Sequence, residues 1–324
     1  MSQKFLKQLE KRCQERPLTL AFPEGDDERV QTAATRLIEN RCADKIILVG
    51  DKASHLSGKC TVISPEDSAM LEKSHQVLQG YLNRKQRSLS KEQEKLWLSH
   101  PANQVGALLA LGEADAAVGG CVLTTGEIIK ASLQTIGLAK DTKIMSSSFV
   151  MVSEEKQKST HYVYADCGVI IQPDENQLAQ LCKDSVDTFQ SLFPGETPKV
   201  AFLSFSTKGS AQDESTLKMI KACEIFRKNY PQIAADGELQ FDAAIVPAIG
   251  KRKAPGSEVA GDANIFIFPD LNAGNIAYKI TQRLAGFDAF GPILQGGAKP
   301  YSDLSRGAST DDIYTAALIT SLRA

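Results

Sequence analysis

Short apolar runs alternate along this chain with longer stretches in which apolar residues recur every three or four positions. Residues 18–22 and 45–49 form two of the apolar runs, and residues 29–38, between them, carry the longer spacing. A continuous apolar run of this length is typical of a strand buried on both faces, and the longer spacing is typical of a helix. Because strand and helix alternate, the pattern predicts an α/β fold with a parallel sheet.

The same alternation continues to the C-terminus, with a new β-rich stretch after Asp141. Residues 143–152 and 161–171 are rich in strand-forming residues, which indicates a second domain. The other strands expected are residues 61–63, 116–118, 199–203 and 265–268. The other helices expected lie within residues 66–97 and at 104–111, 127–136, 175–192, 215–229, 276–284 and 313–322.

Composition narrows the classes of function. The chain has 324 residues, of which 42% are hydrophobic and 23% charged, and a formal net charge of −2. It therefore lacks the basic excess that a nucleic-acid partner or an acidic membrane surface requires. Seven cysteines without a CxxC pair favour free thiols in a reducing compartment, and no apolar run approaches the ~20 residues of a membrane span. We expect a cytoplasmic protein with neither a nucleic-acid partner nor a membrane segment.

Residues 305–312 combine a hydroxyl, a guanidinium and a carboxylate around the start of the closing helix, which we expect to be amphipathic. Ser309 and Asp312 have the spacing of a capping box, but aspartate is short for reaching back, so we expect its carboxylate to stay available. Arg306 offers donors suited to phosphate beside the positive end of the helix dipole. Spacing alone leaves two interpretations open, an anion site or an ordinary helix cap beside a surface arginine.

Three other segments could bind anions, and each has a plain structural alternative. Thr124 and Thr125 follow a small-residue loop and could contact phosphoryl oxygens or cap the next helix. Residues 204–210 could cradle a phosphate or form a turn, because the full P-loop spacing is absent. Lys279 and Arg283 lie one helical turn apart and could receive phosphates or form a solvated helix face.

Other kinds of chemistry have weaker support in the sequence. Cys167 has no histidine at an informative spacing, so a buried thiol is favoured over a nucleophile. The four histidines show neither HxH nor HExxH spacing, and no metal site is expected. No GxGxxG motif follows the first strand, which leaves a nicotinamide site without its fingerprint.

Motifs in a fixed order along nearly the whole chain match a known family, among them Asp303-Leu-Ser-Arg-Gly307. They are residues 23–29, 114–116, 165–167, 203–206, 236–240, 253–257, 261–264, 268–271, 273–279, 282–284 and 303–307. In this order and spacing they closely resemble phosphate acetyltransferases, also called phosphotransacetylases, of the phosphate acetyl/butyryltransferase family. The resemblance implies two open α/β domains with a cleft between them, like isocitrate and isopropylmalate dehydrogenases. The first domain would be discontinuous, residues 1–142 with 290–324, and the second would be residues 143–289.

The activity that the resemblance implies is reversible acetyl transfer, in which acetyl-CoA and phosphate give CoA and acetyl phosphate by direct attack in a ternary complex. Asp312 is then the expected base for the thiol, and Ser305 and Arg306 are the expected donors to the carbonyl oxygen. Lys130 stands where the family usually has arginine, which keeps the charge but loses the bidentate fork. The substrate-binding residues expected are Arg84, Thr124, Thr125, Lys130, Asn275, Tyr278 and Arg283.

The resemblance also implies a homodimer that uses coenzyme A as a substrate, with no tightly bound cofactor and no metal. One alternative is a phosphate butyryltransferase, with the same chemistry on a longer acyl chain. Another is a non-catalytic regulatory or oligomerisation domain, and a third is a hydride-transferring dehydrogenase, which would need a nicotinamide.

Overall fold

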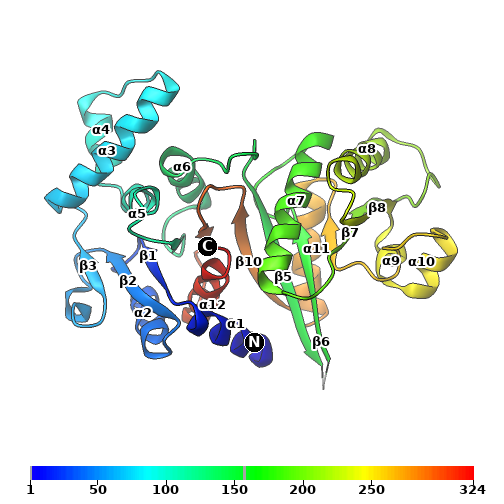
Figure 1. Cartoon of the computed structure of the whole chain (residues 1–324), viewed down its shortest axis with the longest axis horizontal. Coiled ribbons are helices and arrows are strands. Elements are labelled where there is room, and N and C mark those ends of the chain that lie inside the picture. Colours follow the sequence, from blue (N-terminus) through cyan, green and yellow to red (C-terminus); the bar gives the residue numbers. More distant parts are fainter. Residues whose placement is uncertain (1, 156–157) are drawn as a thin grey trace. The chain divides into compact units, whose positions relative to one another are not determined.

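The computed structural model describes residues 2–155 and 158–324, which form two compact units (Figure 1). Leu6–Asp141 and Gly297–Ala324 make up the first, which we call the terminal unit. Thr142–Gly296, with the first residues up to Phe5, makes up the second, the central unit. Each unit consists of one sheet and its helices, so the expected α/β class is confirmed.

The units divide at different residues from those that the sequence indicates. The expected boundary at 290 falls inside strand β10 (Asp288–Gln295), which pairs antiparallel with β5 (Ser146–Glu155) at both its ends. The N-terminus joins the central unit because Phe5 stacks on Phe193, with 5.7 Å between ring centroids. Pairing and aromatic packing of this kind leave no mark in the local sequence pattern.

The terminal unit contains a five-stranded parallel sheet in the order β11-β4-β1-β2-β3, which confirms the parallel sheet expected for this part of the chain. Its strands are β1 (Leu18–Phe22), β2 (Ala43–Val49), β3 (Thr61–Ile63), β4 (Ala116–Gly119) and β11 (Tyr301–Asp303). Its helices are α2 (Glu28–Glu39), η1 (Ser54–Leu56), α3 (Ser68–Lys85), α4 (Lys91–Leu98), α5 (Pro101–Ala110), α6 (Thr125–Thr135) and α12 (Thr310–Ser321), and α1 (Gln3–Glu15) spans the boundary near the N-terminus.

Helix α12 is buried on most of its surface, so the expectation of an amphipathic closing helix is wrong. It packs against α2, β4, β11 and β1. Its hydroxyl side chains avoid the cost of burial by donating to carbonyls of the preceding turn. Thr315 donates to Asp311 O at 2.8 Å, and Ser321 donates to Ala317 O at 2.9 Å. The hydroxyl of Thr320 also forms a hydrogen bond of 2.8 Å with the hydroxyl oxygen of Ser302 on β11.

The central unit contains a six-stranded mixed sheet in the order β10-β5-β6-β9-β7-β8. The pairs β10-β5 and β5-β6 are antiparallel, and the other pairs are parallel. The remaining strands are β6 (Lys158–Ala165), β7 (Lys199–Leu203), β8 (Ala234–Leu239) and β9 (Ile265–Ile267). The helices are α7 (Glu175–Leu192), α8 (Glu214–Asn229), α9 (Phe241–Ile245), α10 (Pro247–Lys253) and α11 (Leu271–Leu284).

Helix α11 begins five residues before the position that the apolar spacing indicates. Asp270 caps it by accepting from the backbone N–H of Ala273 at 2.9 Å. The first turn approaches the chain after β6 so closely that a Cβ at Gly274 would lie 2.1 Å from the carbonyl oxygen of Asp166. Glycine at this position allows that approach, and because it has no side chain the periodicity could not indicate the turn.

Candidate functional site

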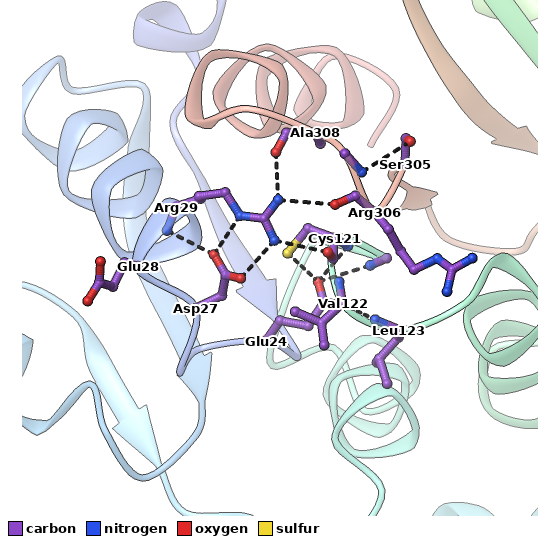
Figure 2. A network of polar contacts seen from close by, with 12 residues as sticks. Glu24, Asp27, Glu28, Arg29, Cys121, Val122, Leu123, Ser305, Arg306 and Ala308 are labelled. Carbon is purple, nitrogen blue, oxygen red and sulfur yellow. Dashed lines mark hydrogen bonds and ion pairs between the residues drawn. The ribbon is translucent and has the colours of Figure 1, made fainter.

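The loop between β11 and α12 exposes the side chains of Ser305 and Arg306. The guanidinium of Arg306 makes no hydrogen bond or ion pair with the residues that the structure describes, and in Figure 2 its side chain extends away from the surrounding polar network. The hydroxyl oxygen of Ser305 accepts from the backbone N–H of Gly307 at 3.4 Å, so its own proton remains for another acceptor. Both side chains can therefore donate to an anion without breaking an existing contact.

Asp312 closes a capping box at the start of α12. Its Oδ2 accepts from both the backbone N–H and the hydroxyl of Ser309, each at 2.8 Å, and Ser309 Oγ accepts from the N–H of Asp312 at 3.2 Å. The expectation that aspartate is too short to reach back is wrong, because the hydroxyl and amide of Ser309 both lie within its reach. The other oxygen, Oδ1, forms no hydrogen bond within the described part of the chain, and the residue is exposed. One carboxylate oxygen thus remains for a proton.

The loop that follows β4 lies beside the loop that precedes α12, but its backbone donors are already occupied. The buried carboxylate of Glu24 accepts from the four consecutive N–H groups of residues 120–123, at 2.7–3.0 Å, and from the thiol of Cys121 at 3.0 Å. A phosphate at these four amides would have to displace an internal carboxylate. The small-residue loop is therefore a scaffold in this structure and holds the start of α6 in place.

Thr124 and Thr125 both use their hydroxyl protons within the protein. Thr124 is the N-cap of α6 and donates to Glu127 Oε2 at 2.8 Å, which agrees with the capping alternative. Thr125 donates to Asp303 Oδ2, at the end of β11, at 2.6 Å. This bond joins the two loops, and a contact of either threonine with substrate stays a prediction.

Asp303 is a second carboxyl group in this region, and no sequence pattern singles it out for a role of its own. It is only 1% exposed, and its Oδ1 has no hydrogen-bond partner among the described residues. Burial raises the pKa of Asp303 from 3.8 to about 7, against the opposing effect of the Thr125 hydrogen bond. A carboxyl group with such a pKa changes charge near neutral pH.

Two exposed cations lie on neighbouring helices of the terminal unit. Arg84 is in the last turn of α3 and Lys130 is on α6, and the two helices pack against each other. Neither side chain has a hydrogen bond or ion pair with another described residue. They are available for anions, as the sequence suggests, although no contact assigns them to one ligand.

The other three expected residues lie on α11 of the central unit. Asn275 donates to the carbonyl of Cys167 at 3.0 Å and accepts from Lys279 at 2.6 Å, so both ends of its amide are occupied. Tyr278 stacks on Phe149 with ring centroids 3.9 Å apart, and burial raises the pKa of its hydroxyl. Arg283 is exposed in the last turn. Asn275 and Tyr278 thus make contacts within the protein, and their contact with substrate stays a prediction. Of the three residues only Arg283 presents an uncommitted charge.

The loop of residues 204–210 also holds a carboxylate of the protein. Glu238, on β8, accepts from the N–H of Gly209 and from the hydroxyl of Ser206, both at 2.8 Å. Lys208 pairs with the carboxylate of Asp236. Donors of this loop that could bind a phosphate thus already donate to Glu238, and the interpretation of residues 204–210 as a turn is favoured.

Comparison with known proteins assigns the chain to a family. The model of the family described as "Phosphate acetyl/butaryl transferase" matches residues 4–321. The phosphate acetyltransferase of Acetivibrio thermocellus is 42% identical over 331 residues, covering 99% of this chain and 98% of its own length. The chain belongs to the phosphate acetyl/butyryltransferase family. A phosphotransacetylase from Streptococcus pyogenes superposes with a TM-score of 0.91 at 36% identity, over 99% of this chain and 98% of its own.

Membership in the phosphate acetyl/butyryltransferase family also agrees with a wider likeness in fold. A 4-hydroxythreonine-4-phosphate dehydrogenase from Klebsiella pneumoniae superposes with a TM-score of 0.52 at 10% identity, over 95% of this chain and 98% of its own. At this identity the likeness concerns architecture alone. It confirms the expected dehydrogenase-like fold and says nothing of hydride transfer.

Three other findings bear on the chemistry of this family member. Cys167 is fully buried and its pKa is raised well above the ordinary value by that burial, which confirms the interpretation as a structural thiol. The described residues contain no group of histidine, cysteine and acidic side chains able to hold a metal ion. Among the same residues no helix has the length and apolarity needed to cross a membrane.

Proposed function

We propose that the protein is a phosphate acetyltransferase, which transfers an acetyl group reversibly between coenzyme A and phosphate. The observation that carries the proposal is the start of α12, where Ser305, Arg306 and Asp312 present uncommitted polar atoms in a chain that matches the family from residue 4 to residue 321. In the direction of acetyl-CoA synthesis, the CoA thiol attacks the carbonyl carbon of acetyl phosphate directly.

Asp312 acts as the base in this step. A thiol with a pKa of about 8.5 is mostly protonated at neutral pH, so a carboxylate that takes its proton during attack makes the sulfur a better nucleophile. Oδ1 is the atom that receives the proton, because Oδ2 is held by Ser309. The bond from sulfur to carbon forms, the bond from carbon to the phosphate oxygen breaks, and phosphate leaves.

Ser305 and Arg306 stabilise the charge that moves during the reaction. The carbonyl oxygen becomes negative as sulfur attacks, and a donor aimed at that oxygen is typically worth roughly 3 kcal/mol. The fork of Arg306 also suits the phosphoryl group, which leaves as an anion. Within the terminal unit, Arg84 and Lys130 provide further positive charge for phosphate or CoA, and Thr124 and Thr125 are expected substrate contacts. Asn275, Tyr278 and Arg283 on α11 of the central unit stay predicted substrate contacts.

The test is release of free thiol from acetyl-CoA when phosphate is added. We expect thiol release that depends on phosphate, and sustained release when arsenate replaces it as acceptor. Absence of any acceptor-dependent release would contradict the proposal. The same assay with butyryl-CoA compares the two acyl chains, and we expect the acetyl substrate to react faster.

We propose further that the protein is a cytoplasmic homodimer without a tightly bound cofactor, a metal or a nucleic-acid partner. All seven cysteines are unpaired thiols, as a reducing compartment allows. Ile276, Ile280 and Leu284 form an apolar stripe along α11 and are 56%, 52% and 83% exposed. Exposed stripes of this kind mark interaction surfaces. Ile280→Glu is expected to shift the mass measured by analytical ultracentrifugation from dimer to monomer, and a monomeric wild type would contradict the proposal.

A further inference from the structure

We propose that Arg29 is a positioning residue, which holds the loop of Ser305 and Arg306 in the conformation needed for acetyl transfer. This inference rests on the proposed function. Arg29 lies in the first turn of α2, 277 positions before Arg306 in the sequence.

The guanidinium of Arg29 has five N–H donors, and each has an acceptor (Figure 2). Nε and Nη2 bind the two oxygens of Asp27 at 3.0 and 2.8 Å. Nη2 also donates to the carbonyl of Cys121 at 3.0 Å, and Nη1 donates to the carbonyls of Arg306 at 3.2 Å and Ala308 at 2.8 Å. One side chain therefore ties together the start of α2, the loop after β4 and the loop before α12.

The two carbonyls that Nη1 binds flank Gly307, the residue of the exposed loop with the widest backbone freedom. Within the loop itself, Ala308 N–H donates to Ser305 O at 2.8 Å, and Gly307 N–H makes a long bond of 3.4 Å to Ser305 Oγ. Fixing the carbonyl of Arg306 fixes the orientation of its peptide. The side chain of Arg306 then lies on the side opposite Arg29, as Figure 2 shows.

The anchor for this contact is itself held by the protein. Asp27 is the N-cap of α2 and accepts from the backbone N–H of Arg29 at 2.9 Å, so cap and ion pair use the same carboxylate. The hydrogen bond from the Arg29 side chain holds the pKa of Asp27 below its usual range. Glu24, in the same segment, fixes the loop after β4 by accepting from the N–H groups of residues 120–123. Segment 24–29 thus supports both loops.

Arg29 has no donor left for a substrate, because all five N–H groups are used. Its contribution to the reaction must pass through the loop. Lysine cannot replace it, because an ammonium has three donors and no planar fork, and cannot satisfy five acceptors on three segments.

The first experiment compares Arg29→Lys with Arg36→Lys. Arg36 is on the same helix and forms an ion pair of 2.6 Å with Asp311, but within the described structure it makes no hydrogen bond to residues 305–308. We expect Arg29→Lys to lower kcat by tenfold or more while the KM for CoA changes less than twofold, and Arg36→Lys to leave both nearly unchanged. Equal kinetics of Arg29→Lys and wild type would overturn the inference.

A double-mutant comparison separates positioning from general damage. If Arg29 acts through Ser305 and Arg306, then Arg29→Lys should lower the residual kcat of a variant that carries both Ser305→Ala and Arg306→Ala less than twofold. A full tenfold loss in that background would show that Arg29 acts by another route. Thermal unfolding of each variant gives the stability against which the kinetics are compared.

Hydrogen exchange tests the loop without any reference to activity. The amides of residues 307–309 should exchange faster in Arg29→Lys than in wild type or Arg36→Lys, and unchanged exchange would overturn the inference. If wild type shows no acyl transfer, the proposed function fails while this measurement still decides whether Arg29 orders the loop. If Arg29→Lys does not fold, Asp27→Asn is the second variant, because it weakens the contacts that hold the Arg29 guanidinium while leaving Arg29 in place. The amides of residues 307–309 should then exchange faster than in wild type, and unchanged exchange would overturn the inference.

Discussion

Replacing Asp303 by asparagine should change how the stability of the terminal unit depends on pH. The carboxyl group is buried at the end of β11, where Thr125 on α6 donates to it. The other groups that face it are the carboxylate of Glu24, which raises its pKa further, and the buried hydroxyl of Tyr301. Asparagine has nearly the same size and can still accept from Thr125, so the main change is the loss of a titrating group.

The size of the effect follows from the pKa of Asp303. A rise from 3.8 to about 7 is about three units, equivalent to about 4 kcal/mol at 1.36 kcal/mol per unit. Between about pH 4 and pH 7 the folded protein binds a proton that the unfolded chain has released. The stability from this group is therefore fully present below about pH 4 and is lost as the pH rises to about 7. The amide that replaces the carboxyl group does not titrate, so Asp303→Asn should lack this loss.

The assay is urea unfolding at pH values from 4.5 to 8, followed by fluorescence of Trp97. This is the single tryptophan of the chain, and it is buried in the terminal unit, so it reports on the unit that contains Asp303. Relative to Asp303→Asn, wild type should lose about 3 kcal/mol of its free energy of unfolding between pH 4.5 and pH 8, because part of the total of about 4 kcal/mol is already lost at pH 4.5. The control Asp311→Asn removes an exposed carboxylate and should follow wild type. If the free energy of unfolding changes with pH in the same way for Asp303→Asn and wild type, the pKa of Asp303 is not raised.

Three substitutions test the proposed chemistry. Asp312→Asn should lower kcat by about a hundredfold or more, since a general base typically contributes 10²–10⁴-fold. CoA affinity and folding should persist, because asparagine can still accept from Ser309. Near-normal turnover would show that Asp312 is not the base. Arg306→Lys should lower kcat by about a hundredfold, because one ammonium does not reproduce the fork, and unchanged kinetics would make Arg306 a surface charge. Lys130→Arg should lower the KM for CoA or acetyl phosphate, and if both stay the same, Lys130 is outside the site.

The elements with regular apolar spacing could be predicted from the sequence, and those with buried polar residues could not. Helix α7 and strand β7 occur at the expected residues because their buried faces are largely apolar. Strand β8 contains Asp236 and Glu238, residue types that usually lie at the surface. Both are buried, and Lys208 and Ser206 satisfy them from another segment. A pairing over about 30 positions is invisible to local periodicity.

The same limit applies to the candidate site. The hydroxyl, guanidinium and carboxylate at the start of α12 could be recognised because they lie within one short segment. The contacts that Glu24 and Arg29 make with the two loops join residues 92 to 279 positions apart, and only the fold brings them together. The prediction that Asp312 is too short to close the capping box is also wrong. Whether its carboxylate reaches Ser309 depends on where the backbone places Ser309, and not on the length of the side chain alone.

Loops that look suited to phosphate are filled by the protein's own carboxylates, and this determines where substrate anions can bind. Three buried carboxylates, those of Glu24, Asp166 and Glu238, accept backbone N–H groups from loops that follow strands. The donors are residues 120–123 after β4, residues 168–170 after β6 and Gly209 after β7. An incoming phosphate would have to expel a carboxylate into a protein interior, where an unpaired charge is costly. Anion binding therefore falls to exposed cationic side chains such as Arg306, whose loop is held by Arg29. Replacing such an arginine by lysine keeps the positive charge but loses the planar fork of donors. The exchange should therefore lower activity far more than the unchanged charge suggests.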